Sequence, residues 1–111
     1  MDLDIRETGS TCVLKLKGSF KNESVRAFSS AVESAFSSGR IYIILNLQDV
    51  PMIDSSGIGA VVNALRRARE LGGDVKLVNP STFARKTFTL VGIWNLFGVF
   101  ATEDEAAAAC A

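Results

Sequence analysis

The chain has 111 residues, 48% of them hydrophobic, and a mean hydropathy of +0.25, so it can bury a core and is expected to form a single domain over residues 1–111. The 12 basic and 12 acidic residues cancel, which leaves no net field to attract nucleic acid. Histidine is absent, which excludes Ser–His and Cys–His catalytic pairs and most zinc sites.

Two strands joined by a short turn are predicted first. Leu3 and Ile5 alternate with charged residues, and residues 12–16 alternate in a similar way. The sequence TGS at 8–10 between them is typical of a hairpin connection. The segment 19–22 that follows is polar apart from one phenylalanine.

An amphipathic helix is predicted next, beginning near Asn22 or Ser24, either of which suits an N-cap, and ending at the sequence SSG of 37–39. Its apolar residues recur every three or four positions: Val25, Phe28, Ala31, Val32, Ala35 and Phe36. The nearly continuous apolar run at 41–45 is typical of a strand covered on both faces, so we expect it in the centre of a sheet.

The second half of the chain predicts three more helices and two more strands. The second helix carries Ile58, Val61, Val62, Leu65, Ala68 and Leu71 on one face and stops at two glycines. A strand around 75–78 leads to a third helix, whose expected inner face is Phe83, Thr87, Leu90 and Val91. A short strand near Val99 precedes a last helix, with Thr102 as its N-cap and three acidic residues in its first turn.

The predicted order of elements is β-β-α-β-α-β-α-β-α. Strands separated by single helices imply parallel pairing with right-handed crossovers. The opening hairpin adds an antiparallel pair. We therefore expect an α/β fold with a mixed, mostly parallel sheet of four to five strands and about four helices.

No segment has the pattern of a signal peptide or of a membrane span. Charged residues interrupt the N-terminal segment, and the longest uncharged run, 87–102, is shorter than the roughly 20 residues that cross a bilayer. Cys12 and Cys110 do not form a disulfide framework. We expect a cytoplasmic protein that does not bind a membrane.

The segment 54–59, with the sequence DSSGIG, places a carboxylate, two hydroxyls and two glycines at the start of the second helix. Unpaired N–H groups and the helix dipole favour negative charge there. The simplest interpretation is an N-cap. Gly57 and Gly59 each cost up to about 1 kcal/mol in a helix, so they indicate a close approach, either of the protein's own sheet or of another protein.

Residues 43–50 (IILNLQDV) and 52–59 (MIDSSGIG) strongly resemble the STAS domain of bacterial anti-sigma factor antagonists, in which an apolar strand leads into a D-S-S-G-L-G turn and a helix. The resemblance extends over nearly the whole chain and includes Gly18, 72–73, 96–97 and 102–106. It implies a STAS fold and a phosphoprotein that regulates transcription by partner switching, not an enzyme, with no cofactor.

The family mechanism makes Ser55 the phosphorylated residue. The resemblance implies that the unphosphorylated protein binds an anti-sigma factor that is also a serine kinase, and thereby frees the sigma factor. Phosphorylation of the first serine of the turn breaks the complex, and a serine phosphatase of PP2C type restores it. The interface is expected to comprise Asp54, Ser56, Gly57, Ile58 and Gly59 with Lys21 and Asn22.

The chain departs from the family pattern after the second strand. The family has Gly-Glu-Leu-Asp there, whereas this chain has GSFKN at 18–22. Lys21 stands where that Asp would be, unless the register slips by one and Asn22 takes its place. A cation near Ser55 would stabilise a phosphate rather than assist its transfer.

Two alternatives remain open. A STAS scaffold or accessory component of a larger regulatory or lipid-transport complex needs the fold but no phosphate turnover, and Lys21 slightly favours it. An enzyme with Ser55 as its nucleophile would need a lysine base, and none is near in sequence.

Two further groups of residues have structural interpretations. Arg66, Arg67 and Arg69 are expected on a solvated helix face or at the rim of a protein interface, rather than in a nucleic-acid site. Trp94, Phe97 and Phe100 are expected in the core or in a subunit contact.

Overall fold

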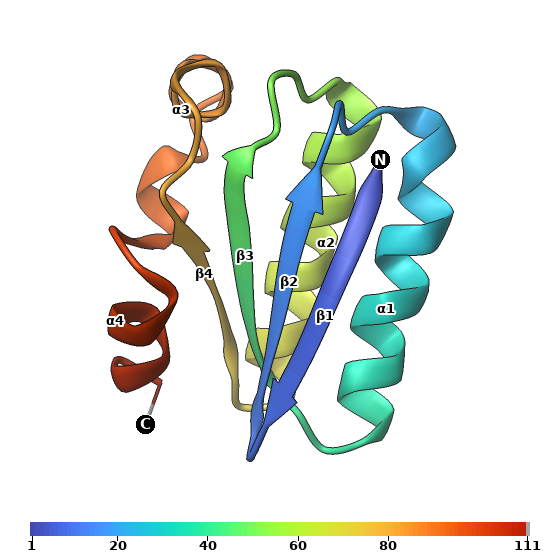
Figure 1. Ribbon diagram of the computed structural model, residues 1–111, viewed down its shortest axis with the longest axis vertical. Coiled ribbons are helices and arrows are strands. Elements are labelled where there is room, and N and C mark those ends of the chain that lie inside the picture. Colours follow the sequence, from blue (N-terminus) through green and yellow to red (C-terminus); the bar gives the residue numbers. More distant parts are fainter. Residues whose placement is uncertain (111) are drawn as a thin grey trace.

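The computed structural model describes residues 1–110 and contains one five-stranded sheet with the strand order β1-β2-β3-β4-β5 (Figure 1). Its strands are β1 (Asp2–Thr8), β2 (Thr11–Lys17), β3 (Tyr42–Asp49), β4 (Asp74–Val78) and β5 (Gly98–Phe100). β1 and β2 pair antiparallel, and the other three neighbouring pairs are parallel. The predicted order of elements and the mixed, mostly parallel sheet are confirmed.

Four α-helices cover the sheet unequally. They are α1 (Val25–Ser37), α2 (Ser55–Glu70), α3 (Thr82–Leu90) and α4 (Glu103–Ala108), with 3-10 turns at Asn22–Ser24 and Trp94–Leu96. α1 and α2 lie side by side along the strands, α4 contacts β3, β4 and β5, and α3 is seen end-on at one end of the sheet (Figure 1). The main core therefore lies between the sheet and the α1–α2 pair.

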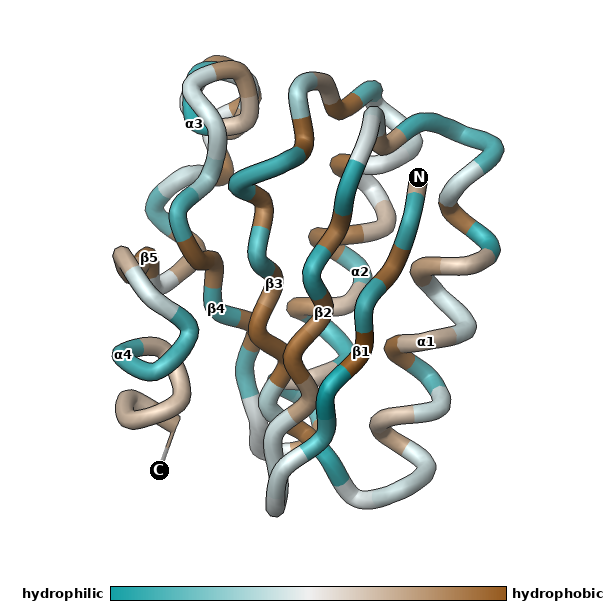
Figure 2. The backbone as a smooth tube through the Cα atoms, in the orientation of Figure 1, coloured by the Kyte–Doolittle hydropathy of each residue, from teal (hydrophilic) through white to brown (hydrophobic). Residues whose placement is uncertain are grey.

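The central position predicted for residues 41–45 is confirmed by burial on both faces of β3. Ile43, Leu45 and Leu47 belong to the main core, while Ile44 belongs to a smaller cluster with Val78 under α4. These four of the eight β3 side chains are fully buried. Apolar residues accordingly concentrate along β2 and β3 (Figure 2).

The predicted inner face of α3 is wrong. Phe83, Leu90 and Val91 are 47%, 86% and 52% exposed, whereas Ala84 and Phe88 are buried. Both stripes have helical spacing, and the helix is so short that periodicity does not choose between them. Because α3 crosses one end of the sheet, only its Ala84–Phe88 stripe reaches the core, where the Phe88 ring lies 5.6 Å from that of Phe97.

One helix end differs from expectation, and another agrees with it in position but not in hydrogen bonding. Leu71, assigned to the inner face of the second helix, is 44% exposed because it is the C-cap of α2, where the chain turns away at Gly72. Ser24 occupies the N-cap position of α1, as one of the two candidates, but its side chain makes no capping hydrogen bond. Asn22 instead begins a 3-10 turn that leads into α1.

The two phenylalanines of α3 offer a matched test of this packing. We expect Phe88→Ala to lower the free energy of unfolding by about 3–5 kcal/mol, since it empties a fully buried site. Phe83→Ala removes the same atoms from an exposed site and should cost less than about 1 kcal/mol. Urea denaturation measures both values, and equal losses would contradict the described orientation of α3.

Candidate functional site

The turn before α2 is attached to the loop that follows β2. Ile53 forms an isolated parallel bridge with Phe20. The Phe20 N–H donates to the Met52 carbonyl at 2.8 Å, and the Asp54 N–H donates to the Phe20 carbonyl at 3.1 Å. Little in the sequence indicates this role of Phe20, which is one large apolar residue within a polar segment.

The Asp54 carboxylate caps α2 and also holds the preceding loop. Its Oδ1 accepts a hydrogen bond from the Gly57 N–H at 2.9 Å, and its Oδ2 accepts one from the Asn22 N–H at 3.1 Å. This geometry selects the N-cap interpretation for Asp54. One side chain thus joins segments 19–24 and 50–57 at the end of the sheet.

Ser55 is the first residue of α2, and its side chain is exposed. Within residues 1–110 its hydroxyl has no hydrogen-bond partner, whereas Asp54 uses both carboxylate oxygens. Ser56 is partly buried, and the exposed Met52 lies on the loop just before the turn. The Ser55 hydroxyl is therefore accessible to another molecule without local unfolding.

The two glycines of the turn have different surroundings. A Cβ on Gly57 would lie 2.8 Å from the Phe20 carbonyl oxygen and 2.9 Å from Ile53 Cγ2, so Gly57 is explained by close approach within the chain. A Cβ on Gly59 would meet nothing within 4 Å. Gly59 is exposed one turn from Ser55, and no contact in the described chain requires it to be glycine.

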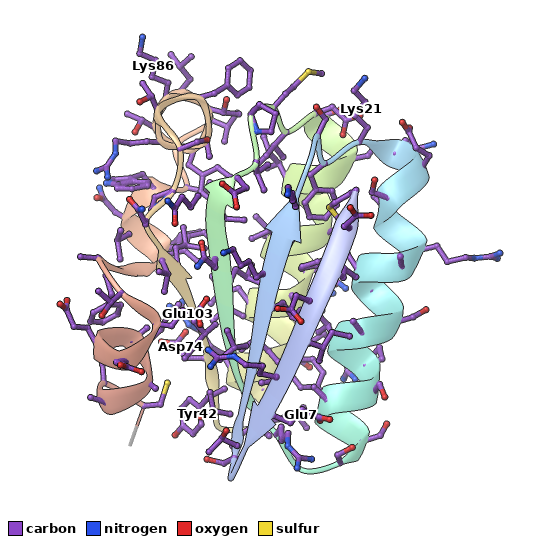
Figure 3. The ribbon with its side chains drawn as sticks, viewed as in Figure 1. Glu7, Lys21, Tyr42, Asp74, Lys86 and Glu103 are labelled. Carbon is purple, nitrogen blue, oxygen red and sulfur yellow. The ribbon has the colours of Figure 1, made fainter. Side chains whose placement is uncertain are left out.

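Lys21 lies on the same end of the molecule as the start of α2. Its backbone is extended, and it immediately precedes the 3-10 turn that begins at Asn22. The Lys21 and Lys86 side chains both project from this end (Figure 3). The structure thus places one cation on the loop that Asp54 holds and another on α3.

The three arginines of α2 bond to oxygens of the same chain. Arg67 makes two hydrogen bonds to Glu33 of α1, at 3.1 and 2.9 Å, which lower the pKa of Glu33. Arg69 contacts Asp74 at 3.1 Å and Arg66 contacts Glu70 at 3.5 Å. These contacts agree with the solvated helix face.

The three aromatic residues near the C-terminus divide between core and partial burial. Phe97 is 7% exposed and packs on Phe88, as expected for a core residue. Trp94 is partly buried, with the Arg85 guanidinium 4.9 Å from its ring centre. Phe100 is partly buried beside the smaller cluster under α4.

Residues 1–110 were also compared with the requirements of a metal site, a membrane-spanning helix and a reactive thiol. They contain no group of three or more His, Cys, Asp or Glu side chains placed to hold a metal ion. None of their helices combines the length and the hydropathy needed to cross a membrane. Burial, assisted by the charge of Glu7, raises the pKa of the Cys12 thiol to about 11, so Cys12 is a poor nucleophile at neutral pH.

Comparison with known proteins identifies the family. The sequence model of the STAS domain matches residues 2–106. The anti-sigma F factor antagonist of Lysinibacillus sphaericus is 32% identical over 102 residues, which cover 89% of this chain and 85% of that protein.

Solved structures agree with this match. The anti-sigma factor antagonist SpoIIAA in its unphosphorylated form superposes with a TM-score of 0.85 at 29% identity, covering 96% of this chain and 93% of that chain. The phosphorylated form of the Bacillus cell fate determinant SpoIIAA gives a TM-score of 0.79 at 29% identity, covering 96% and 97%. From its sequence match and its fold, the chain belongs to the STAS domain family.

Proposed function

We propose that this protein is a cytoplasmic anti-sigma factor antagonist whose binding is controlled by phosphorylation of Ser55. The observation that carries the proposal is an accessible serine hydroxyl at the first position of a helix whose cap is supplied by another residue. Relatives of matching length are anti-sigma factor antagonists, and one of them has been solved with and without phosphate. The partner is an anti-sigma factor with serine kinase activity.

A phosphate at Ser55 is expected to weaken binding of the partner without lowering the stability of the fold. It adds about −1.5 to −2 charges at pH 7, which the start of α2 tolerates because the helix dipole favours negative charge there by about 0.3–1 kcal/mol. The same group in a protein interface has to be desolvated and repels acidic neighbours. Phosphorylation therefore releases the partner while the fold persists, and a PP2C-type serine phosphatase resets the protein.

The surface around Ser55 fits a docking site. Met52 is 37% exposed on the preceding loop, Ser56 and Ile58 are partly buried in the first turn of α2, and Gly59 is bare. Asp54 holds Asn22 and the Lys21 loop against this turn. The partner's backbone can approach α2 at Gly59, where no side chain intervenes.

Lys21 supports a second candidate function. If its cation prevents transfer of a phosphate to Ser55, the protein acts as a non-phosphorylated STAS scaffold or accessory component of a larger regulatory or lipid-transport complex. Incubation with a candidate kinase and ATP, followed by mass spectrometry, separates the two functions, because the switch requires phosphate on Ser55 and the scaffold does not.

Replacing Ser55 by a permanent negative charge should mimic the released state. We expect Ser55→Asp to weaken binding of the cognate kinase by tenfold or more, since about 1.4 kcal/mol of lost interface energy corresponds to tenfold. Its melting temperature should change little, because an acidic side chain at this helix position is favourable. Ser10→Asp, which adds the same charge in the hairpin turn at the far end of the sheet, should bind normally.

Calorimetric titration with the kinase measures both affinities. Equal affinities of wild type and Ser55→Asp for the kinase would contradict control of binding by phosphorylation of Ser55. Equal losses in Ser55→Asp and Ser10→Asp would trace the effect to net charge rather than to the turn.

Replacing Gly59 by alanine should increase the stability of the fold and weaken binding of the kinase. We expect Gly59→Ala to raise the free energy of unfolding by up to about 1 kcal/mol, because alanine is the better helix former and the added methyl group meets nothing. The same methyl group should weaken kinase binding, because it stands where the partner approaches. Gly57→Ala is the matched contrast and should be destabilised by its clash with Phe20. A Gly59→Ala variant that binds as wild type does would exclude Gly59 from the interface.

Lys21 should slow modification of Ser55. We expect Lys21→Asp, which introduces the residue type of the family pattern, to increase the initial rate of phosphate incorporation, and Lys21→Gln to give an intermediate rate. Lys86→Asp, at the same end of the molecule, controls for a general change in surface charge. Unchanged rates in both Lys21 variants would show that this side chain does not influence the reaction.

A further inference from the structure

β1 is an unprotected edge of the sheet. Within residues 1–110 its only strand neighbour is β2. Six of its seven residues are exposed, and its apolar Ile5 is 48% exposed. A long exposed edge strand presents unpaired backbone groups on which another strand can pair.

The hairpin determines which backbone groups of β1 are free. Thr8 and Thr11 pair on either side of a two-residue turn, so they form the hydrogen-bonded closing pair. Because hydrogen-bonded and non-hydrogen-bonded pairs alternate, Leu3, Ile5 and Glu7 direct their N–H and C=O groups away from β2. The same three side chains face the α1 side of the sheet, since they pair with residues of β2 that point into the core.

A groove of about 330 Å³ runs between β1 and α1. Leu3 and Ile5 line it from the strand. The helix contributes only small side chains: Ala27, Ser30, Ala31, Ser34 and Ala35. The space beside Ile5 can therefore accept a further apolar side chain.

We propose that β1 pairs antiparallel with β1 of a second copy of this chain, about a two-fold axis at Ile5. The two Ile5 side chains then lie opposite each other in the groove, and Leu3 of each copy lies opposite Glu7 of the other. The three outward-directed residues of each strand form about six backbone hydrogen bonds. One continuous sheet runs through both copies, with both α1 helices on the same face.

Charge selects this register among those centred within β1. Like charges directly opposite each other destabilise a strand pair. An axis at Asp4, Arg6 or Glu7 places that charged side chain opposite the same residue of the second copy. An axis at Leu3 places Asp2 of each copy opposite Asp4 of the other. Centring it on Ile5 instead places Asp4 of each copy opposite Arg6 of the other, which gives two attractive pairs.

The side chains of Arg6 and Asp4 lie on the face of the sheet away from α1. Arg6 contacts Glu103 of α4 on that face, inward from the edge, and Asp4 of the second copy would approach Arg6 from beyond the edge. Because the two β1 strands are antiparallel, the α2 N-termini of the two copies point in opposite directions. The dimer thus presents two separate Ser55 turns, and its formation does not depend on the function proposed for them.

Sedimentation velocity of the intact chain over a concentration series tests the proposal. We expect a monomer–dimer equilibrium for the wild type. Asp4→Lys and Arg6→Glu each place like charges opposite each other twice, so each alone should dimerise at least about tenfold more weakly. An equal mixture of the two variants should recover wild-type dimerisation, because the new lysine then faces the new glutamate.

Circular dichroism confirms that each variant is folded. Ile5→Asp should abolish the dimer, whereas Leu90→Asp, at the more exposed apolar side chain on α3, should leave it intact. A wild type that stays monomeric throughout the series overturns the proposal. The proposal is also overturned if the mixture of the two folded variants dimerises no more strongly than either variant alone. A dimer that is lost in Leu90→Asp but kept in Ile5→Asp overturns it as well.

Discussion

The Asp54 carboxylate is the contact on which the site depends. It accepts hydrogen bonds from the N–H groups of Asn22 and Gly57, two residues on segments that are far apart in the chain. The Phe20–Ile53 bridge runs beside it and fills the end of the core with a fully buried ring. Together these contacts hold the loop after β2 against the start of α2.

This arrangement separates the structural from the chemical residues of the turn. Asp54 caps the helix and Gly57 permits the close approach of Phe20, so both have a structural role. Ser55 and Gly59 make no such contribution and face solvent. A modification at Ser55 can therefore alter the surface while the cap and the core persist, which is the physical requirement for a switch that acts through docking rather than through internal motion.

Sequence patterns correctly predicted buried residues where a strand is covered on both faces or where a helix has a single periodic apolar face. The apolar run at 41–45 became the central strand, and the inner face predicted for α1 is buried at Phe28, Val32, Ala35 and Phe36. They failed for α3, where two stripes of equal spacing compete and the orientation of the helix at the end of the sheet decides between them. They also missed Phe20, because a strand-like bridge of one residue has no period to detect.

The sequence by itself determined the α/β class, the order of the elements and the position of the DSSG turn at the start of a helix, because these follow from local periodicity and from residue types that favour caps and turns. Only the tertiary structure decided which groups bond to Asp54, which of the two glycines is free of contacts, and that β1 lies at an edge of the sheet. Those properties depend on distances between segments that are remote in the chain, and local patterns carry no information about such distances.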